Sequence, residues 1–402
     1  MTPSIVILGS YPPPYGGIAT HLKHFIPHLL KQNYQVRVVA SGERFEVEQV
    51  NGFHVHRMTK DRIHNFRLLL PQLPRLASSF FRQPFPALDF LKAQAIFSIA
   101  EPLIQNAQLI CAYHLLPWGL AGAWLSEKYK LPFLCANFGE IHSNPAFYRR
   151  HLKQIQYIAR QAKHLVSSSH HCARGLSLIG IHKPVETIYI GVDTQLFSPN
   201  NDPKKIRARF GIPENVPLVL FVGRLIRDMG LHTLLEAIPL FNSKAATLIV
   251  GADGKLADES RKLAVRYPGR VFVCTDTPFS ELPFYYSAAD LFVAPSPDNR
   301  SCGGLAIEEA MATAKPVVAC RVGGIPETVV DGETGLLIPP EKPHQLAVAI
   351  QKLLDDPAAR LKMGEAGRQR AIELFSLETT NRLMEQAYRR AMKETMDKTN
   401  GR

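Results

Sequence analysis

The chain has 402 residues, of which 46 % are hydrophobic and 20 % are charged, the balance of a globular protein that buries a sizeable core. Its net charge of +12 favours an anionic partner such as a nucleotide, an anionic lipid or a nucleic acid, although a solubility bias explains the charge equally well. No apolar run reaches the ~18 residues of a membrane-spanning helix, so no integral membrane protein is expected.

The length predicts two domains, because one hydrophobic core rarely grows to this size. Six cysteines are scattered without a close CxxC pair, which argues against a zinc module. The apolar run at the start of the sequence is too short for a signal peptide. These observations predict a cytoplasmic protein, and no nucleic-acid partner is expected.

The chain begins with the pattern of a parallel α/β unit. Residues 4–9 (SIVILG) are continuously apolar, as in a strand buried on both faces. Gly16 and Gly17 then precede a helical pattern, and residues 35–40 form a second strand. The two glycines admit a phosphate or an acceptor sugar closely, although a tight turn explains them equally well. The loop is not GxGxxG, which argues against a dinucleotide oxidoreductase.

Residues 60–100 interrupt the alternation with a basic and apolar stretch. Its arginines alternate with leucines and phenylalanines (Arg62, Arg67, Arg75 and Arg82). Such a stretch is typical of peripheral contact with an anionic membrane surface, which would make a lipid-linked acceptor natural and place the protein at the inner membrane face. Four prolines cut it into short pieces and favour the alternative, core helices with solvated arginines.

Two further strands end in polar residues. LICAYH ends at His114, and PFLCANF is followed by Glu140 and His142. Parallel sheets bind ligands at the carboxyl ends of their strands, so these three residues are candidate catalytic groups. The chain has 15 histidines, and an ordinary structural role is the alternative for each. A polar linker at about residues 195–206 then predicts a domain boundary.

The second half restarts the alternation with PLVLFVG, after which Arg224 is placed to clamp a diphosphate in bidentate fashion. Asp290–Leu337 reads as strand, glycine loop, helix, strand and glycine loop. Gly303 and Gly304 open its helix, whose N-terminal N–H groups suit a phosphate. Glu309, one turn in, can accept hydrogen bonds from ribose or sugar hydroxyls. The whole pattern predicts an α/β protein of two doubly wound, Rossmann-like domains facing across a cleft.

Several motifs in order resemble retaining glycosyltransferases of family 4, which have the GT-B fold. They are YPPPYGGIATHL, LFVGRLIRDMG, VGADG, YYSAADLFVAPS and GLAIEEAMATAKPVVACRVGGIPETVVDGETGLL, and they span nearly the whole chain. The resemblance implies retaining transfer of a sugar from a nucleotide-sugar co-substrate to a glycan, lipid-linked or small-molecule acceptor. It implies no metal, in keeping with the absence of DxD, and no cofactor.

The resemblance also implies domains and residue roles. Residues 1–195 form the acceptor-side domain, residues 206–375 the nucleotide-sugar domain, and residues 376–402 a helix that returns to the first domain. Arg224 binds the donor diphosphate and Glu309 the ribose, which leaves Glu308 as a solvated neighbour. Two glycine pairs add backbone N–H groups to the donor site (Gly303 and Gly304, Gly16 and Gly17).

Two positions in the second half depart from the family pattern. The first glutamate of the EX7E motif falls on Ser301, whose hydroxyl can hydrogen-bond but supplies no anion; Asp298 is the alternative in a shifted loop. The lysine five positions after the arginine falls on Met229, and Arg227 or Lys255 are alternatives for its charge.

The third departure is Phe138, where the family often has a histidine; Glu140 or His142 can take the polar role there. The three departures leave a second hypothesis, a non-catalytic relative that binds a nucleotide or a glycan and supports a partner enzyme. A sugar-nucleotide epimerase on the same fold is less favoured, because the loops match the transferases better.

Overall fold

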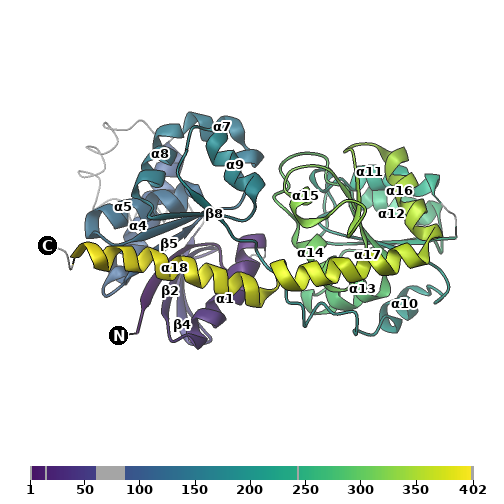
Figure 1. Cartoon of the computed structure of the whole chain (residues 1–402), viewed down its shortest axis with the longest axis horizontal. Coiled ribbons are helices and arrows are strands. Elements are labelled where there is room, and N and C mark those ends of the chain that lie inside the picture. Colours follow the sequence, from purple (N-terminus) through teal and green to yellow (C-terminus); the bar gives the residue numbers. More distant parts are fainter. Residues whose placement is uncertain (1, 14–15, 60–86, 242–243, 400–402) are drawn as a thin grey trace. The chain divides into compact units, whose positions relative to one another are not determined.

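The structure is a computed structural model, and it describes residues 2–13, 16–59, 87–241 and 244–399 (Figure 1). Two compact units divide the chain. The first unit consists of the chain up to Ile190 together with the C-terminal part from Thr380, and the second unit spans Gly191–Thr379. The division therefore falls just before the polar linker, because Val192 already pairs with Ser376 of the second unit in an isolated β-bridge.

The first unit is built on an eight-stranded sheet with the order β3-β4-β2-β1-β5-β6-β7-β8. Every neighbouring pair is parallel except β3 and β4, an antiparallel hairpin at one edge. The sequence did not predict this hairpin, because β3 (EVEQV) is polar and only half covered. The strands are β1 (Ser4–Gly9), β2 (Gln35–Gly42), β3 (Glu46–Val50), β4 (Phe53–Thr59), β5 (Leu109–Tyr113), β6 (Phe133–Asn137), β7 (His164–Ser167) and β8 (Val185–Thr187).

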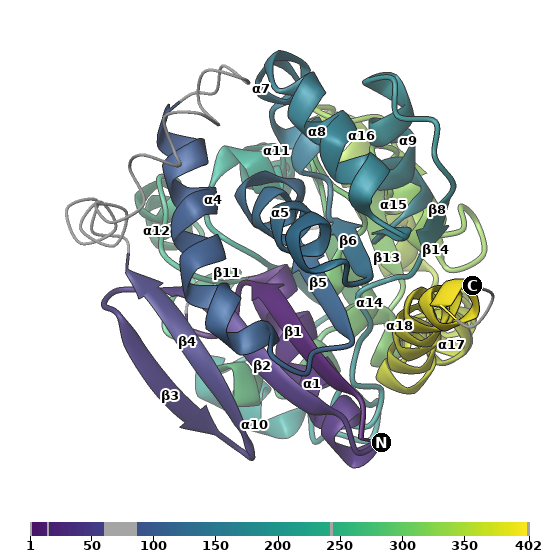
Figure 2. The same cartoon turned by 90° about the vertical axis from the view of Figure 1, so that its left-hand side faces the viewer.

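Helices cover both faces of this sheet because its central strands are apolar on both faces (Figure 2). In β1, Ile5 and Ile7 share a core with α1 and α18, whereas Val6 and Leu8 share a core with α4, α5 and α8. The helices are α1 (Gly17–Lys31), α4 (Ala87–Ala100), α5 (Leu120–Tyr129), α6 (Glu140–Ser143), α7 (Pro145–Arg150), α8 (Leu152–Gln161) and α9 (His170–Leu178), together with α18 (Leu377–Thr399).

Helix α18, yellow in Figure 1, ends the described chain and packs on the first unit. Apolar residues on one side of it enter the core beside α1 (Met384, Ala387, Tyr388 and Ala391). The hydroxyl of Tyr388 lies 2.9 Å from that of Tyr113 at the end of β5, a buried pair that satisfies both groups.

The second unit is built on a six-stranded, fully parallel sheet with the order β11-β10-β9-β12-β13-β14. Its strands are β9 (Leu218–Val222), β10 (Ala246–Val250), β11 (Val271–Cys274), β12 (Leu291–Ala294), β13 (Val317–Cys320) and β14 (Gly335–Ile338). Its helices are α10 (Lys204–Phe210), α11 (Leu231–Ala237), α12 (Ala257–Arg266), α13 (Leu282–Ala288), α14 (Leu305–Ala312), α15 (Ile325–Thr328), α16 (Pro343–Asp355) and α17 (Pro357–Arg370). The two sheets, parallel except at the β3–β4 hairpin, confirm the prediction of two Rossmann-like α/β domains.

The basic stretch with Arg62, Arg67, Arg75 and Arg82 lies outside the described residues, apart from its last part, which forms α4. Contact with an anionic membrane therefore stays a prediction. In the part of the chain that the structure describes, no helix combines the length and the apolar character needed to cross a membrane.

Candidate functional site

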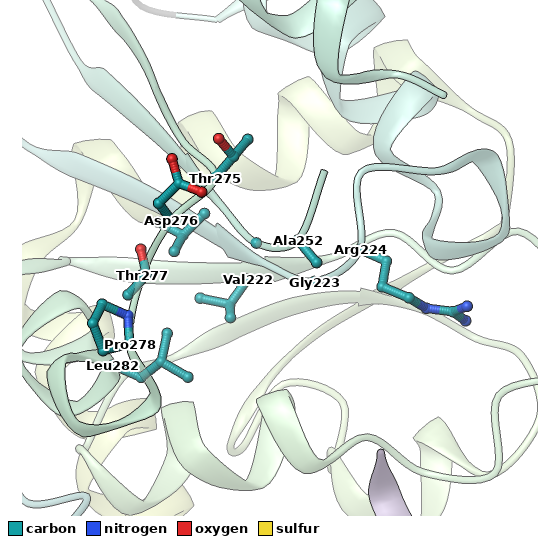
Figure 3. A pocket seen from close by; sticks show the side chains of 11 residues that line it. Val222, Gly223, Arg224, Ala252, Thr275, Asp276, Thr277, Pro278 and Leu282 are labelled. Atoms are coloured by element: carbon teal, nitrogen blue, oxygen red, sulfur yellow. The ribbon is translucent and has the colours of Figure 1, made fainter. Parts of the chain in front are cut away.

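A cavity of about 430 Å³ opens at the carboxyl ends of β9, β10 and β11 in the second unit (Figure 3). This is the edge at which parallel sheets bind ligands. Its lining combines strand ends with the loop after β11 (Val222, Gly223, Arg224, Val250, Gly251, Ala252, Thr275, Asp276, Thr277, Pro278 and Leu282). The walls are mainly apolar, and Thr275, Asp276 and Thr277 add polar groups, which suits a flat heterocycle that also needs hydrogen bonds.

Arg224 stands at one side of this cavity, two residues after β9. In Figure 3 its guanidinium points away from Thr275, Asp276 and Thr277. The side chain is exposed, and within the described ranges it takes part in no ion pair. Its fork of donors is thus available for an anion next to whatever fills the cavity. Met229 lies beside Gly223 in the same loop, so that loop lacks a second cation at the position where the family has one.

The strand beside β9 is β12, and it leads into the glycine loop before α14. Gly304 is the N-cap of α14 and offers no side chain to its first N–H groups. Ser301 is turned into its own loop, because its hydroxyl donates a 2.7 Å hydrogen bond to the carbonyl of Gly303. Its carbonyl accepts a 2.9 Å hydrogen bond from the N–H of Gly324 in the loop after β13. The two glycine loops therefore hold each other.

Gly323 makes this close approach possible. Its φ of 58° is in the left-handed region, and a Cβ atom there would lie 1.9 Å from the carbonyl oxygen of Ser301. No other residue type fits without moving one of the two loops.

Glu308 and Glu309 lie in the first turns of α14, and both are buried, with 3 % and 4 % of their surface exposed. The expectation that Glu308 is solvated was wrong, because the fold buries it, and α14 packs against α17 and the segment that follows α17. Burial raises the pKa of Glu309 to about 8, although the hydrogen bond from Tyr286 acts in the opposite direction and lowers it. Burial and the neighbouring Glu309 raise the pKa of Glu308 to about 8.

Asp298 is engaged by Arg300. Both of its carboxylate oxygens accept hydrogen bonds from the guanidinium, and this contact with Arg300 lowers the pKa of Asp298. Arg300 also pairs with Asp228 in the loop after β9, at 3.1 and 3.2 Å. The arginine thus ties the loops after β9 and β12 together, and Asp298 takes part in that link.

In the first unit the structure brings two of the predicted catalytic residues together. The Nδ1 atom of His114 lies 3.4 Å from the Glu140 carboxylate. That carboxylate accepts hydrogen bonds from the N–H groups of Leu115, at 2.9 Å, and Phe138, at 2.6 Å. Burial lowers the pKa of His114, but Glu140 outweighs it and leaves the pKa raised; burial raises the pKa of Glu140, but His114 and the backbone donors leave it lowered.

The backbone of His114 is held in an unusual conformation. Its φ of 106° and ψ of 147° fall in a region that is nearly exclusive to glycine. Such strain persists only where surrounding contacts impose it, and it clusters at functional sites. Here it aims the imidazole from the carboxyl end of β5 toward Glu140.

His142 does not join this pair. Its ring stacks on that of His171 with 3.8 Å between centroids, and its Nε2 lies 2.9 Å from the His171 carbonyl oxygen. Phe138, where the family often has a histidine, lies instead among rings, with centroids 5.7 Å from Tyr113 and 6.4 Å from His114. Two imidazoles lie beside this ring, that of His21 with 6.2 Å between centroids and that of His114 from the preceding strand.

Gly16 and Gly17 begin α1 at the carboxyl end of β1. Gly16 is the N-cap and leaves the first N–H groups of α1 without a side-chain acceptor of its own. A Cβ atom on Gly16 would meet nothing within 4 Å. A role for these two glycines at a phosphate stays a prediction.

Sequence reasoning missed several residues of these sites. The rule that ligands bind at the carboxyl ends of parallel strands, applied to the apolar run at residues 270–274 (RVFVC), would have found Thr275, Asp276 and Thr277. Nothing in the sequence signals that Tyr286 meets Glu309, because their partnership depends on how α13 packs against α14. Among the described residues no group of three or more His, Cys, Asp or Glu side chains is arranged to hold a metal ion.

Two family models match the chain in adjoining pieces. Residues 15–196 match the model of Glycosyltransferase Family 4, and residues 202–370 match that of Glycosyl transferases group 1. The pieces correspond closely to the two units of the structure.

Curated relatives agree with these models. A D-inositol 3-phosphate glycosyltransferase of Corynebacterium glutamicum is 39 % identical over 193 residues, which are 45 % of this chain and 46 % of that protein. The matched part thus spans about half the length of that relative. A GDP-mannose-dependent alpha-(1-6)-phosphatidylinositol monomannoside mannosyltransferase of Mycolicibacterium smegmatis is 26 % identical over 93 % of this chain and 95 % of its own length.

Solved structures share the fold. Sucrose-phosphate synthase of Thermosynechococcus elongatus superposes with a TM-score of 0.74 at 24 % identity, over 96 % of this chain and 98 % of its own. HepE of Anabaena in complex with UDP-glucose superposes with a TM-score of 0.73 at 21 % identity, over 96 % of this chain and 99 % of its own.

Proposed function

The chain belongs to the family 4 glycosyltransferases of the group 1 type, which have the GT-B fold, and we propose that it transfers a sugar from a nucleotide-sugar donor to a glycan, lipid-linked or small-molecule acceptor. The observation that carries this proposal is the cavity at the carboxyl ends of β9, β10 and β11, with Arg224 at its side. The N-terminus of α14, which has no side-chain cap, follows β12, the strand beside β9.

The donor would lie along that edge of the sheet. Its base fits the cavity, and its diphosphate meets Arg224 and the N–H groups of Gly303 and Gly304. When the bond to the sugar breaks, negative charge grows on the diphosphate, and these fixed donors stabilise it. We propose that this stabilisation operates without a metal or a cofactor, and that the product keeps the anomeric configuration of the donor. Unchanged turnover in EDTA and the anomeric proton couplings of the product test the two points.

The acceptor side is assigned to the first unit. His114, held by Glu140 and by its strained backbone, is the favoured catalytic group there, because its imidazole is partly exposed at a strand end. His142 is the less favoured candidate, since its ring stacks on His171 and its Nε2 atom already contacts the His171 carbonyl oxygen. A positioned imidazole can bind or deprotonate an acceptor hydroxyl.

The alternative function is binding without catalysis. Ser301, Met229 and Phe138 favour it, because each removes a polar or charged group that the family uses, and the Ser301 hydroxyl is already engaged within its loop. The two functions predict the same nucleotide binding and differ only in turnover.

One experiment separates the possibilities. Nucleoside diphosphates are titrated calorimetrically into the wild type, Arg224→Ala and the control Arg261→Ala, whose arginine is exposed on α12 and pairs with Asp253 and Asp258. Loss of the Arg224 clamp weakens binding by about 1.5–3 kcal/mol, roughly 10- to 150-fold, whereas the control changes little. Unchanged binding in Arg224→Ala refutes the site. Normal binding without turnover of any nucleotide sugar establishes the binding-only function.

We also propose that the protein works in the cytoplasm and contacts the inner membrane face through its basic stretch. A relative that acts on a phosphatidylinositol mannoside supports a lipid-linked acceptor. Sedimentation with anionic liposomes should fall when Arg67 and Arg75 are replaced by alanine. Equal sedimentation of both proteins, or none, would refute the contact.

A further inference from the structure

Asp276 is the acidic side chain in the lining of the cavity at the carboxyl ends of β9, β10 and β11. It is exposed, and it forms no hydrogen bond or ion pair with another residue that the structure describes. Figure 3 shows it beside Thr275 and Thr277, and the guanidinium of Arg224 points away from all three. A carboxylate without a protein partner at a cavity wall has both of its oxygens available to hydrogen-bond donors of a ligand.

The loop that carries Asp276 also offers donors. Thr275, Asp276 and Thr277 follow β11 directly and belong to no helix or strand. Within the described ranges, none of their backbone N–H groups donates a hydrogen bond to a carbonyl oxygen. The hydroxyl of Thr277 is already engaged, because it lies 3.2 Å from the Sγ atom of Cys274. The loop therefore presents a free acceptor, the carboxylate, close to free backbone donors.

The nucleobases differ in the base-pairing edge that they would turn toward such a loop. Guanine has one acceptor, its O6 atom, beside two donors, its N1–H group and its 2-amino group. Uracil flanks its single donor with two carbonyl oxygens, which a carboxylate repels. Adenine and cytosine each place a ring nitrogen acceptor beside their amino group, so a carboxylate meets only one donor. Guanine alone donates two parallel hydrogen bonds to one carboxylate, the geometry of the strong bidentate pairs.

We propose that Asp276 selects guanine, and hence that the sugar donor is a guanosine diphosphate sugar. The inference rests on the proposed function, which places the donor base in this cavity and its diphosphate at Arg224. The far edge of the base then meets the loop after β11, where N1–H and the 2-amino group donate to Asp276 and O6 accepts from a backbone N–H group. The apolar side chains of Val222, Pro278 and Leu282 cover the ring.

Asp253 provides a matched control. It is an exposed aspartate that follows β10, next to the lining residue Ala252, so its replacement removes the same charge close to the cavity. Its carboxylate pairs with Arg261 at 3.2 Å and does not belong to the cavity lining. Asp253→Asn therefore measures what a lost negative charge does to diphosphate binding, without a change in the contact with the base.

The test titrates GDP, UDP, ADP, CDP and inosine diphosphate, which is GDP without the 2-amino group, into the wild type, Asp276→Asn and Asp253→Asn. The wild type should bind GDP about tenfold or more tightly than each of the others, because hydrogen bonds to a charged acceptor are strong. In Asp276→Asn the Kd values of GDP and inosine diphosphate should come within about twofold, since the amide turns a donor toward guanine. Asp253→Asn should keep the wild-type ratio.

Thermal unfolding of the variants completes the test. No described residue binds the Asp276 carboxylate, so Asp276→Asn should keep the wild-type Tm, and a change in nucleotide preference then reports the contact alone. The inference is overturned if the wild type binds UDP, ADP or CDP as tightly as GDP. It is also overturned if Asp276→Asn keeps the preference for GDP over inosine diphosphate, or if Asp253→Asn loses it equally. A wild type that binds none of the five nucleotides refutes the proposed function instead.

Discussion

The hydroxyl of Tyr286 donates a 2.7 Å hydrogen bond to the carboxylate of Glu309, and both groups are buried. The contact joins α13 to α14 behind the glycine loop and fixes one oxygen of the carboxylate. The remaining acceptor capacity of Glu309 is what a ribose hydroxyl would use. Tyr286 therefore sets the orientation of the residue to which the family resemblance assigns the nucleotide.

Replacing Tyr286 by phenylalanine should weaken nucleoside diphosphate binding. Without this hydrogen bond the Glu309 carboxylate can adopt other orientations. We expect the loss to cost about 1 kcal/mol of binding free energy, or roughly fivefold in Kd. Tyr285→Phe is the matched control: the neighbouring tyrosine is equally buried, but its hydroxyl binds Arg209 and Cys274 instead. Calorimetry on the two variants measures the difference. Equal losses in both would show that Tyr286 acts only through stability.

The two buried carboxyl groups predict a stability that falls as pH rises. Burial raises the pKa of Glu308 and of Glu309 to about 8, from 4.5 in an unfolded chain. The folded protein thus holds protons that the unfolded chain releases. This stabilisation is complete below about pH 4.5 and is lost as pH rises through about 8.

Glu308→Gln isolates one of these groups, since Glu308 Oε2 is buried with no hydrogen-bond partner among the described residues. The variant should melt about 5 °C higher than the wild type at about pH 8, and close to it at about pH 5. Thermal unfolding across this pH range is the measurement. A constant difference at every pH would contradict the buried charge as its cause.

The His114–Glu140 pair predicts a shifted histidine titration. Although burial lowers the pKa of His114, the Glu140 carboxylate raises it above its ordinary value. Glu140→Gln removes that charge, so the pKa of His114 should drop, and stability that the imidazolium contributes at acid pH should shrink. Titration of the His114 ring protons by NMR reports the change. An unchanged titration of His114 in Glu140→Gln would contradict the pairing.

Gly323 and Gly332 separate crowding from backbone strain. Both have positive φ, 58° and 78°, but a Cβ atom at Gly332 would meet nothing within 4 Å. Gly332→Ala should cost about 1 kcal/mol of unfolding free energy. Gly323→Ala should cost more, because it forces the Ser301 carbonyl away, and should also weaken nucleotide binding. Denaturant unfolding with calorimetry tests both, and equal costs would contradict the contact.

The parallel strands and the helices between them could be predicted because their periods are strong. SIVILG is strand Ser4–Gly9 and LFVAP is strand Leu291–Ala294 with its proline just beyond, as the apolar runs indicate. The polar hairpin strand Glu46–Val50 carries no such signal. The apolar run PLVLFVG placed Arg224 just past a strand end but could not show what surrounds it.

Contacts between side chains from distant parts of the chain could not be predicted from the sequence. Glu308 was expected in solvent because the family resemblance assigned the site role to Glu309 alone, and only the tertiary packing of α14 shows that both are buried. The contacts of the buried Arg57 with Pro12 and Glu48 could not be predicted either, because the three residues lie in separate segments of the sequence. Long-range contacts of this kind depend on tertiary packing, which local patterns do not encode.

The central claim is that the chain transfers a sugar, and one measurement tests it most directly. The purified protein is incubated with a mixed pool of nucleotide sugars and candidate acceptors, and products are identified by mass spectrometry beside Arg224→Ala. The claim predicts that one nucleotide sugar is consumed, that its nucleoside diphosphate accumulates, and that Arg224→Ala slows both by about tenfold or more. An unchanged pool with a protein that still binds the nucleoside diphosphate would contradict it.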